Sequence, residues 1–199
     1  MEGTPRTLIL YHGGCPDGFG GAYAAWKKFG DAAEYIPLHR GEPLPDGIDG
    51  ARVYLIDFTY PREIMDELLA RAASLVVLDH HDGVREVVEA MPEYVFDNDR
   101  SGATIAWDHF HPDTPTPYFL KLLEDGDLYR MALADTVPLH AYLETRPFVF
   151  EEWDECAQAL EEPLARAHDG ARRSSSSQTL QATRSASSPQ AAPGGSSCK

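Results

Sequence analysis

The sequence has few cysteines and no long apolar run. Its three cysteines, Cys15, Cys156 and Cys198, are odd in number and far apart, and none forms a Cys-x-x-Cys pair. This spacing argues against a disulfide framework or structural zinc and favours reduced thiols. No stretch approaches the ~18 apolar residues of a membrane span, and the N-terminus lacks the charged-then-apolar layout of a signal peptide. We therefore expect a cytoplasmic protein that does not associate with membranes.

Basic residues are scarce in most of the chain. The first 170 residues hold all 32 Asp and Glu but only 13 of the 17 Lys and Arg, and the formal net charge of the whole chain is −15. Counterion release by many Lys and Arg drives ordinary nucleic-acid binding, so we expect no binding to long duplexes. Short anionic substrates held through metal ions remain compatible with this charge.

The segment 171–199 contains no Asp or Glu and is rich in Ser, Ala, Pro, Gln and Gly. It has too few large apolar side chains to offset the entropy of ordering, which predicts disorder. The acidic helical pattern before it changes abruptly, and we hypothesise that the tail follows a reading-frame shift. The alternative is an ordinary flexible tail, and resequencing the coding region distinguishes the two.

Strand and helix patterns alternate before the tail. This order predicts an α/β fold: a mostly parallel sheet of about five strands, with helices on both faces and a helical C-terminal segment. Apolar runs predict strands at residues 7–12, 33–39, 52–58, 74–81 and 94–97. Helical spacing or helix-start signals predict helices at residues 19–29, 61–73, 82–91, 101–110, 117–126 and 150–162, with Ser101 as an N-cap.

Polar side chains follow three of the predicted strands. They are His12, Cys15 and Asp17 after the first strand, Asp57 after the third, and Asp79, His80 and His81 after the fourth. The carboxyl ends of parallel strands meet at one edge of a sheet, where active sites form. Each acid alone is more simply a helix cap. Caps do not require two histidines and the Gly-flanked turn "HGGCPDGFGG", so a shared site is the better interpretation of the set.

The residue types at these strand ends indicate a metal. Carboxylates mixed with imidazoles, without repeated thiolates, suit Mn²⁺ or Mg²⁺, with Mn²⁺ as first choice; Fe²⁺, Co²⁺ and Zn²⁺ could also bind. Converging carboxylates repel one another unless cations lie between them, which implies one or two bound ions. Two such ions can activate a water for in-line attack on phosphorus.

Four motifs, "HGGCPDGFGG", "LIDF", "LDHHDG" and "EDGDLYR", occur in an order that resembles the DHH phosphoesterase family. The resemblance runs from residue 7 to about residue 160 and is strongest to a branch with a Cys-Pro-Asp-Gly first motif. It implies a DHH-type α/β metal-binding domain over residues 1–130 and a helical extension or linker over residues 131–170. Members usually carry a second, substrate-binding domain, and nothing after residue 160 resembles it. A chain this short would therefore keep the metal-binding half and have feeble activity.

The resemblance also implies roles for individual residues. Asp57 would bridge two metal ions. Asp17, His80 and Asp127 would complete the coordination shell of one ion. His12 and the residue at the position of Cys15 would bind the other. Many members have an aspartate where this chain has Cys15, and a thiolate prefers zinc or iron to manganese.

Asp79 and His81 are the candidate catalytic residues. Asp79 would orient a histidine, and His81 would donate to the substrate phosphate or the leaving oxygen. Arg100 could meet a phosphate, although an exposed arginine without a partner is the simpler interpretation. Three tryptophans, Trp26, Trp107 and Trp153, fall on apolar helix faces and are expected in the core.

Three functions remain open. The first is a metal-dependent phosphodiesterase that acts like a 3'-5' exonuclease on short single-stranded oligonucleotides or small nucleotides. The second is a phosphoanhydride hydrolase acting on pyrophosphate or polyphosphate, which would need a pocket rich in Lys and Arg. The third is a non-catalytic metal-binding remnant.

Overall fold

The computed structural model describes residues 5–161. Contacts divide the chain into two units, Met1–Gln158 and Ala159–Lys199, and all the strands belong to the first. The part of the predicted helical extension that reaches Gln158 also lies within this first unit. The tail predicted to be disordered, residues 171–199, lies outside the described residues.

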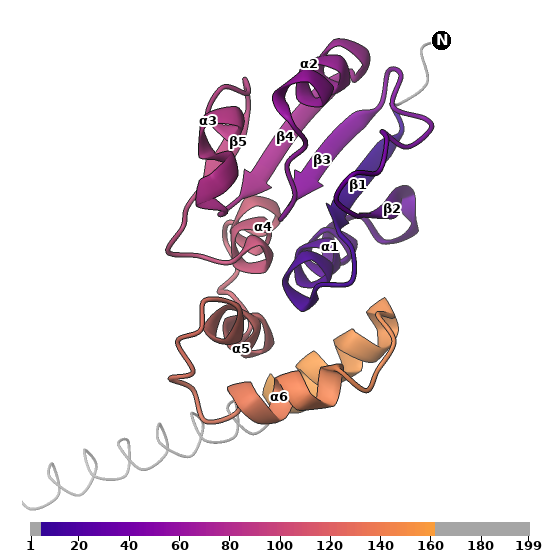
Figure 1. Cartoon of the computed structure of the whole chain (residues 1–199). Coiled ribbons are helices and arrows are strands. Elements are labelled where there is room, and N and C mark those ends of the chain that lie inside the picture. The colour runs from indigo at the N-terminus through magenta and orange to yellow at the C-terminus, as the bar shows by residue number, and fades with distance from the viewer. Residues whose placement is uncertain (1–4, 162–199) are drawn as a thin grey trace, which may run out of the picture. The chain divides into compact units, whose positions relative to one another are not determined.

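Five parallel strands form one sheet in the order β2-β1-β3-β4-β5 (Figure 1). They are β1 (Thr7–His12), β2 (Ala33–Leu38), β3 (Arg52–Ile56), β4 (Ser74–Asp79) and β5 (Tyr94–Phe96). The register pairs Ile56 with Tyr11 on one side and with Leu78 on the other. The carboxyl ends of β1, β3 and β4 are therefore level, so the residues that come after them start from one edge of the sheet.

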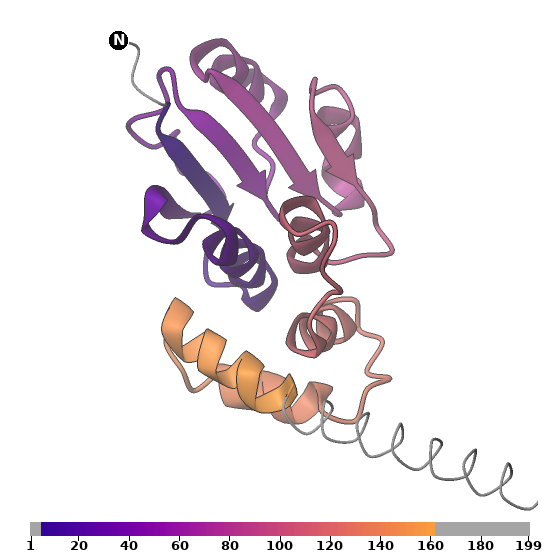
Figure 2. The same cartoon turned by 180° about the vertical axis from the view of Figure 1, so that it is seen from behind.

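Helices cover both faces of this sheet, which confirms the predicted α/β class. The helices and helical turns are α1 (Pro16–Phe29), η1 (Gly30–Ala32), α2 (Arg62–Arg71), η2 (Asp82–Val84), α3 (Arg85–Val88), α4 (Gly102–Phe110), α5 (Tyr118–Asp127) and α6 (Thr136–Leu143), followed by a helix at residues 150–161. Helices α1 and α4 lie on one face, and α2 and α3 lie on the other (Figures 1 and 2). Within residues 5–161, no helix combines the length and apolar character needed to cross a bilayer.

The two faces of the sheet bury alternate residues of each strand. On the α2 and α3 side, the core includes Leu8, Leu10, Val53, Leu55, Leu75 and Val77. On the opposite face, α1 packs so closely on β3 that a Cβ at Gly21 would lie 2.4 Å from Cγ2 of Ile56. Strands buried on both faces appear in the sequence as continuous apolar runs, which is why they were predictable.

The C-terminal part of this unit packs against α1. The ring of Phe19 stacks on Phe148 and Phe150 and meets Trp153 edge-on at 4.7 Å between centroids. Trp153 is 1% exposed and Trp107 is 6% exposed, as expected for core residues. The expectation was only partly right for Trp26, which is half-buried. This aromatic cluster anchors the helix that carries Asp17.

Several predicted boundaries differ from the structure. The third strand ends at Ile56 rather than residue 58 because Asp57 adopts a left-handed conformation with φ of 56°. The fourth ends at Asp79, so His80 and His81 leave the sheet. The helical segment predicted at residues 82–91 ends early, at Val88, and is divided into a 3-10 turn, η2, and the single turn of α3. The valines and the Asp-Gly start of this segment have weak helical propensity.

Candidate metal centre

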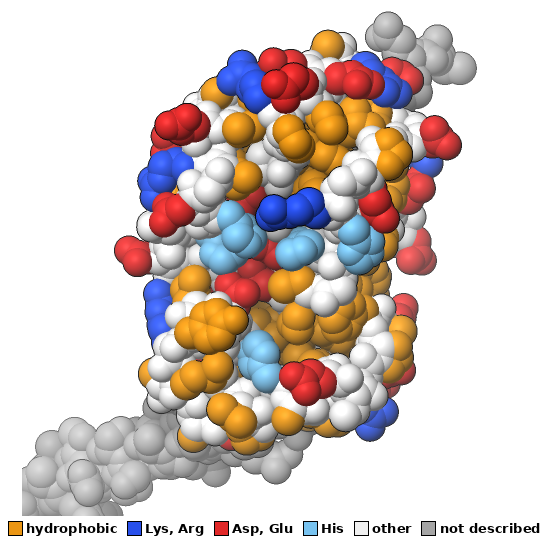
Figure 3. Space-filling model, viewed as in Figure 1, with side chains coloured by type: hydrophobic (Ala, Val, Ile, Leu, Met, Phe, Trp, Pro, Cys, Tyr) orange, Lys and Arg blue, Asp and Glu red, His pale blue; other side chains and the backbone are white. Residues whose placement is uncertain are grey.

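All the sequence-predicted metal ligands meet at the carboxyl edge of the sheet. Their ligand atoms form three groups, and within each group the atoms lie within 4.8 Å of one another. The groups are His12, Cys15 and Asp57; Asp57, His80 and His81; and Asp17, His80 and Asp127. Figure 3 shows imidazoles gathered around acidic side chains on this face, next to apolar ones.

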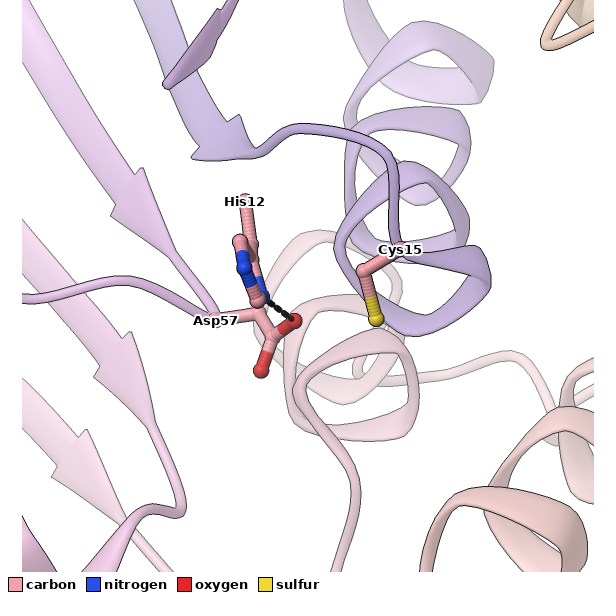
Figure 4. A group of neighbouring side chains, drawn as sticks. All are labelled: His12, Cys15 and Asp57. Atoms are coloured by element: carbon pink, nitrogen blue, oxygen red, sulfur yellow. Dashed lines mark ion pairs between the residues drawn. The ribbon is translucent and has the colours of Figure 1, made fainter. Parts of the chain in front are cut away.

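Asp57 is at the centre of these groups. It is 2% exposed, and its backbone N–H donates to the carbonyl of Leu78 at 2.9 Å. Its Oδ1 lies 3.1 Å from Nε2 of His80 and 3.6 Å from Nδ1 of His81. Its Oδ2 lies 3.4 Å from Nδ1 of His12 and has no hydrogen-bond partner among the described residues. Figure 4 shows His12 and Cys15 close to this carboxylate.

The donor set and the orphaned oxygen both fit a divalent cation. A buried carboxylate oxygen without a hydrogen bond is costly, and metal coordination is one of the few ways to satisfy it. Imidazole nitrogens and carboxylate oxygens from other elements surround the Asp57 carboxylate. The residues present therefore fit one ion on each side of Asp57.

Asp17 is held by the start of α4. Its Oδ2 accepts from the N–H of Gly102 at 2.7 Å, and its Oδ1 accepts from the N–H of Ala103 at 3.0 Å. The first N–H groups of a helix have no partner within the helix and attract negative charge. Oδ2 also lies 3.6 Å from Nε2 of His80, so the helix start holds this carboxylate against the cluster.

Sequence reasoning missed Gly102 and Ala103 as partners of Asp17. The signal available was the predicted cap at Ser101, whose side chain accepts from the N–H of Thr104 as expected. A correctly predicted helix start implies free N–H groups at its first turn. It does not say which carboxylate will face them.

Asp79 is occupied by local hydrogen bonds. Its Oδ1 accepts from the backbone N–H groups of His80 and His81, at 2.7 and 3.0 Å, and lies 2.8 Å from Nδ1 of His81. Its Oδ2 accepts from the hydroxyl of Thr59 at 2.6 Å, a contact that the sequence did not suggest. Asp79 therefore belongs to none of the ligand groups, and its geometry suits a residue that orients His81.

Asp127 ends α5, and its Oδ2 lies 3.7 Å from Nε2 of His80. The segment after it is fixed by Asp125, which sequence reasoning also missed. Asp125 accepts from the backbone N–H groups of Ala132 and Leu133, both at 3.0 Å, and from the hydroxyl of Thr136. Buried Asp125 thus fixes the segment that follows Asp127 and leads into α6.

Arg100 does not match the expectation of an exposed arginine without a partner. Its Nε lies 3.2 Å from a carboxylate oxygen of Glu124, and its Nη1 lies 3.0 Å from one of Asp108. It therefore links the start of α4 to α5. The expectation was wrong because Glu124 lies on α5, whose packing the local sequence does not specify, and because the fold of α4 brings Asp108 within reach.

In the metal-free site, the positive charge of the protonated imidazoles offsets the negative charge of the carboxylates. The contact with Asp57 raises the pKa of His12 to about 10. Burial lowers the pKa of His80, but the contact with Asp57 and the charges of Asp17 and Asp127 outweigh it and bring the value to about 9. Burial, together with the charges of Asp57 and Asp127, raises the pKa of Asp17 well above its usual range. A cation can take the place of these protons.

We expect the metal-free protein to lose stability as the pH rises from 6.5 to 10. Within this interval the folded state binds more protons than the unfolded state, because His12 and His80 have raised pKa values of about 10 and about 9. This stabilisation is fully present below pH 6.5 and is lost as the pH rises through the folded-state values. The melting temperature in the presence of a chelator measures it.

The control for this prediction is His12→Asn. In this variant the melting temperature should fall less between pH 6.5 and pH 10. Excess Mn²⁺ should also reduce this fall, because the ion replaces the protons. A melting temperature that rises over the same interval would contradict the prediction.

Known proteins resemble this chain in sequence and in fold. No family model matches the chain. An "Uncharacterized protein R106" of Acanthamoeba polyphaga mimivirus is 30% identical over 164 residues, which cover 74% of this chain and 39% of that protein. The chain therefore spans about two fifths of the length of this relative. The crystal structure of an uncharacterized protein from Helicobacter pylori G27 is similar in fold, with a TM-score of 0.53 and 13% identity over 65% of this chain and 44% of that one.

Proposed function

We propose that this chain is a metal-dependent phosphodiesterase of the DHH type that hydrolyses short oligonucleotides or small nucleotides. One observation carries the proposal: the two oxygens of the buried Asp57 carboxylate face different sets of imidazoles. Oδ1 faces His80 and His81, and Oδ2 faces His12. A carboxylate placed in this way could serve both ions of a two-metal hydrolytic site.

Two ions would be held by different donors. Asp17, His80 and Asp127 would complete the coordination of one ion with two carboxylates and one imidazole, a donor set that suits Mn²⁺. His12 and Cys15 would serve the other, where the thiol favours Zn²⁺ or Fe²⁺. When bound, such ions stabilise charge on phosphoryl oxygens and make a water nucleophilic at neutral pH.

His81 is the proposed proton donor. Its side chain is half-exposed, with Nδ1 fixed 2.8 Å from Asp79, so the rest of its ring is accessible to a substrate. The contact with Asp79 raises the pKa of His81, which favours the protonated imidazolium. An imidazolium beside the phosphate can neutralise it or protonate the leaving oxygen.

The charge around the site favours a phosphodiester over a polyphosphate. A cavity of about 710 Å³ opens beside His12, Asp57 and His81, and among residues 5–161 Arg40 is the one Lys or Arg that lines it. A polyphosphate carries charge on every phosphorus and needs several cationic partners. A phosphodiester, which has one charged phosphate with neutral substituents, matches this cavity better than a polyphosphate does.

The test measures hydrolysis by the purified chain for every combination of three metal ions and three substrates. Mn²⁺, Mg²⁺ and Zn²⁺ are each combined with a 5'-phosphorylated dinucleotide, inorganic pyrophosphate and tripolyphosphate. We expect metal-dependent release of mononucleotides and little release of inorganic phosphate. Phosphate release from the anhydrides alone would assign a phosphoanhydride hydrolase, and tight Mn²⁺ binding without any turnover would assign a metal-binding module.

A further inference from the structure

We propose that the cavity beside the metal centre is a nucleoside pocket, which holds the base and sugar attached to the reacting phosphate. This inference rests on the proposed phosphodiesterase activity and adds the part of the substrate that the site recognises. The cavity measures about 710 Å³, and His12, Asp57, Asp79 and His81 form one of its walls. A phosphate held at the metal centre would therefore place one of its substituents in this cavity.

The remaining wall is mainly apolar and comes from the loop after β3, the start of α2, and the helical turns η2 and α3 that follow β4. It includes Phe58, Tyr60, Pro61, Ile64, Val84 and Val87. A wall of this kind excludes water and favours a flat, weakly polar group such as a nucleobase. It is poorly suited to a second phosphate, which would lose its hydration there without cationic partners.

Phe58 joins the metal centre to this wall. Its ring centroid lies 6.1 Å from that of His12 and 4.9 Å from that of Tyr60, which it meets edge-on. Tyr60 is 2% exposed, and its hydroxyl donates to the carbonyl of Pro43 at 3.3 Å. Because Tyr60 is fixed, the half-buried Phe58 has a rigid support and can present its ring to a base.

The rim of the cavity carries polar groups suited to a nucleotide. Glu42 accepts from the backbone N–H of His39 at 2.8 Å, which fixes its carboxylate at the rim. Arg40 is exposed and forms no ion pair within residues 5–161, so it is available to a ligand. An alkyl chain would use neither group. The volume lies within the range of about 300–1,000 Å³ that is usual for small-molecule sites.

The experiment compares two esters that share one leaving group. Thymidine 5'-(p-nitrophenyl phosphate) and methyl p-nitrophenyl phosphate both release nitrophenol but retain a nucleoside or a methyl group. Ile64→Trp fills the cavity from α2, and Leu69→Trp, on the exposed side of the same helix, is the matched control. For Ile64→Trp we expect the ratio of kcat/KM values, nucleoside over methyl, to fall by at least about tenfold. The methyl ester alone should change little, and Leu69→Trp should change neither.

An unchanged ratio in Ile64→Trp would overturn the pocket while leaving the hydrolase proposal intact. Preference for an octyl p-nitrophenyl phosphate over the thymidine ester would overturn it as well, by indicating an apolar ligand. Circular dichroism checks the fold, and Val84→Trp fills the cavity from another element if Ile64→Trp does not fold.

If the wild-type chain hydrolyses neither ester, the hydrolase proposal fails, and calorimetry on the Mn²⁺-loaded chain still tests the pocket. AMP should then bind at least about tenfold more tightly than ribose 5-phosphate, and Ile64→Trp should remove the difference. Equal binding of the two compounds would overturn the pocket.

Discussion

Replacement of Asp57 by Asn should reduce metal-dependent phosphodiester hydrolysis by about 100- to 1,000-fold, the scale of losing one electrostatic stabiliser in an enzyme. Asn keeps the volume of the side chain and tolerates the left-handed φ of 56° at this position, so the fold should survive. The variant removes the charge that Oδ1 presents to His80 and that Oδ2 presents to His12. Initial rates with Mn²⁺ and a dinucleotide measure the effect.

The matched control is Asp66→Asn, which removes an exposed carboxylate of α2 that pairs with Arg62 at 2.8 Å. It should keep wild-type rates. Calorimetry with Mn²⁺ should show weakened binding in Asp57→Asn alone. Wild-type turnover by Asp57→Asn would remove Asp57 from the centre of the site and reject the two-metal assignment.

Gly102→Ala should disrupt the candidate metal centre although residue 102 is not one of its proposed ligands. A Cβ at this position would lie 2.6 Å from Cβ of Asp57 and 3.0 Å from Oδ2 of Asp17. One of the two carboxylates must move, and the rigid start of α4 leaves the methyl group little freedom to yield. We expect hydrolysis to fall by about 100-fold or more, because displaced groups lose their preorganised geometry. Overpacking should also lower the free energy of unfolding by about 1–3 kcal/mol.

Gly20→Ala separates these two effects. Its Cβ would lie 2.8 Å from Cδ1 of Leu123 and 2.9 Å from Cβ of Ala103, so it overpacks the junction of α1, α4 and α5 without touching a ligand carboxylate. Chemical denaturation should show a loss of stability in both variants. Calorimetry should show weakened Mn²⁺ binding in Gly102→Ala alone, and equal affinities in the two variants would refute the steric explanation.

The sheet edge was predictable because its signals are local. Continuous apolar runs identified the strands, and the polar residues after β1, β3 and β4 had to share an edge once the strands were parallel. The cap at Ser101 followed from residue type and position. The helical segment predicted at residues 82–91 is shorter than expected and ends at Val88, in line with the weak helical propensity of its valines.

Asp127 is a candidate site residue that strand and helix patterns could not predict. It lies 47 residues beyond His80 in the sequence and on a helix outside the sheet, and only the resemblance of "EDGDLYR" to a family motif indicated it. Its position 3.7 Å from His80 depends on how α5 packs against α1 and α4. Strand and helix propensities do not encode that packing.

By itself, the sequence determined the α/β class, the strand ends and the carboxylates and imidazoles that stand there, because these depend on short-range periodicity and residue chemistry. The tertiary structure alone decided that α4 holds Asp17, that Arg100 is paired, and that an apolar cavity opens beside Asp57. Each of these depends on side chains from distant elements meeting at distances of a few ångströms. Helix packing and strand register fix such distances, and no local pattern contains them.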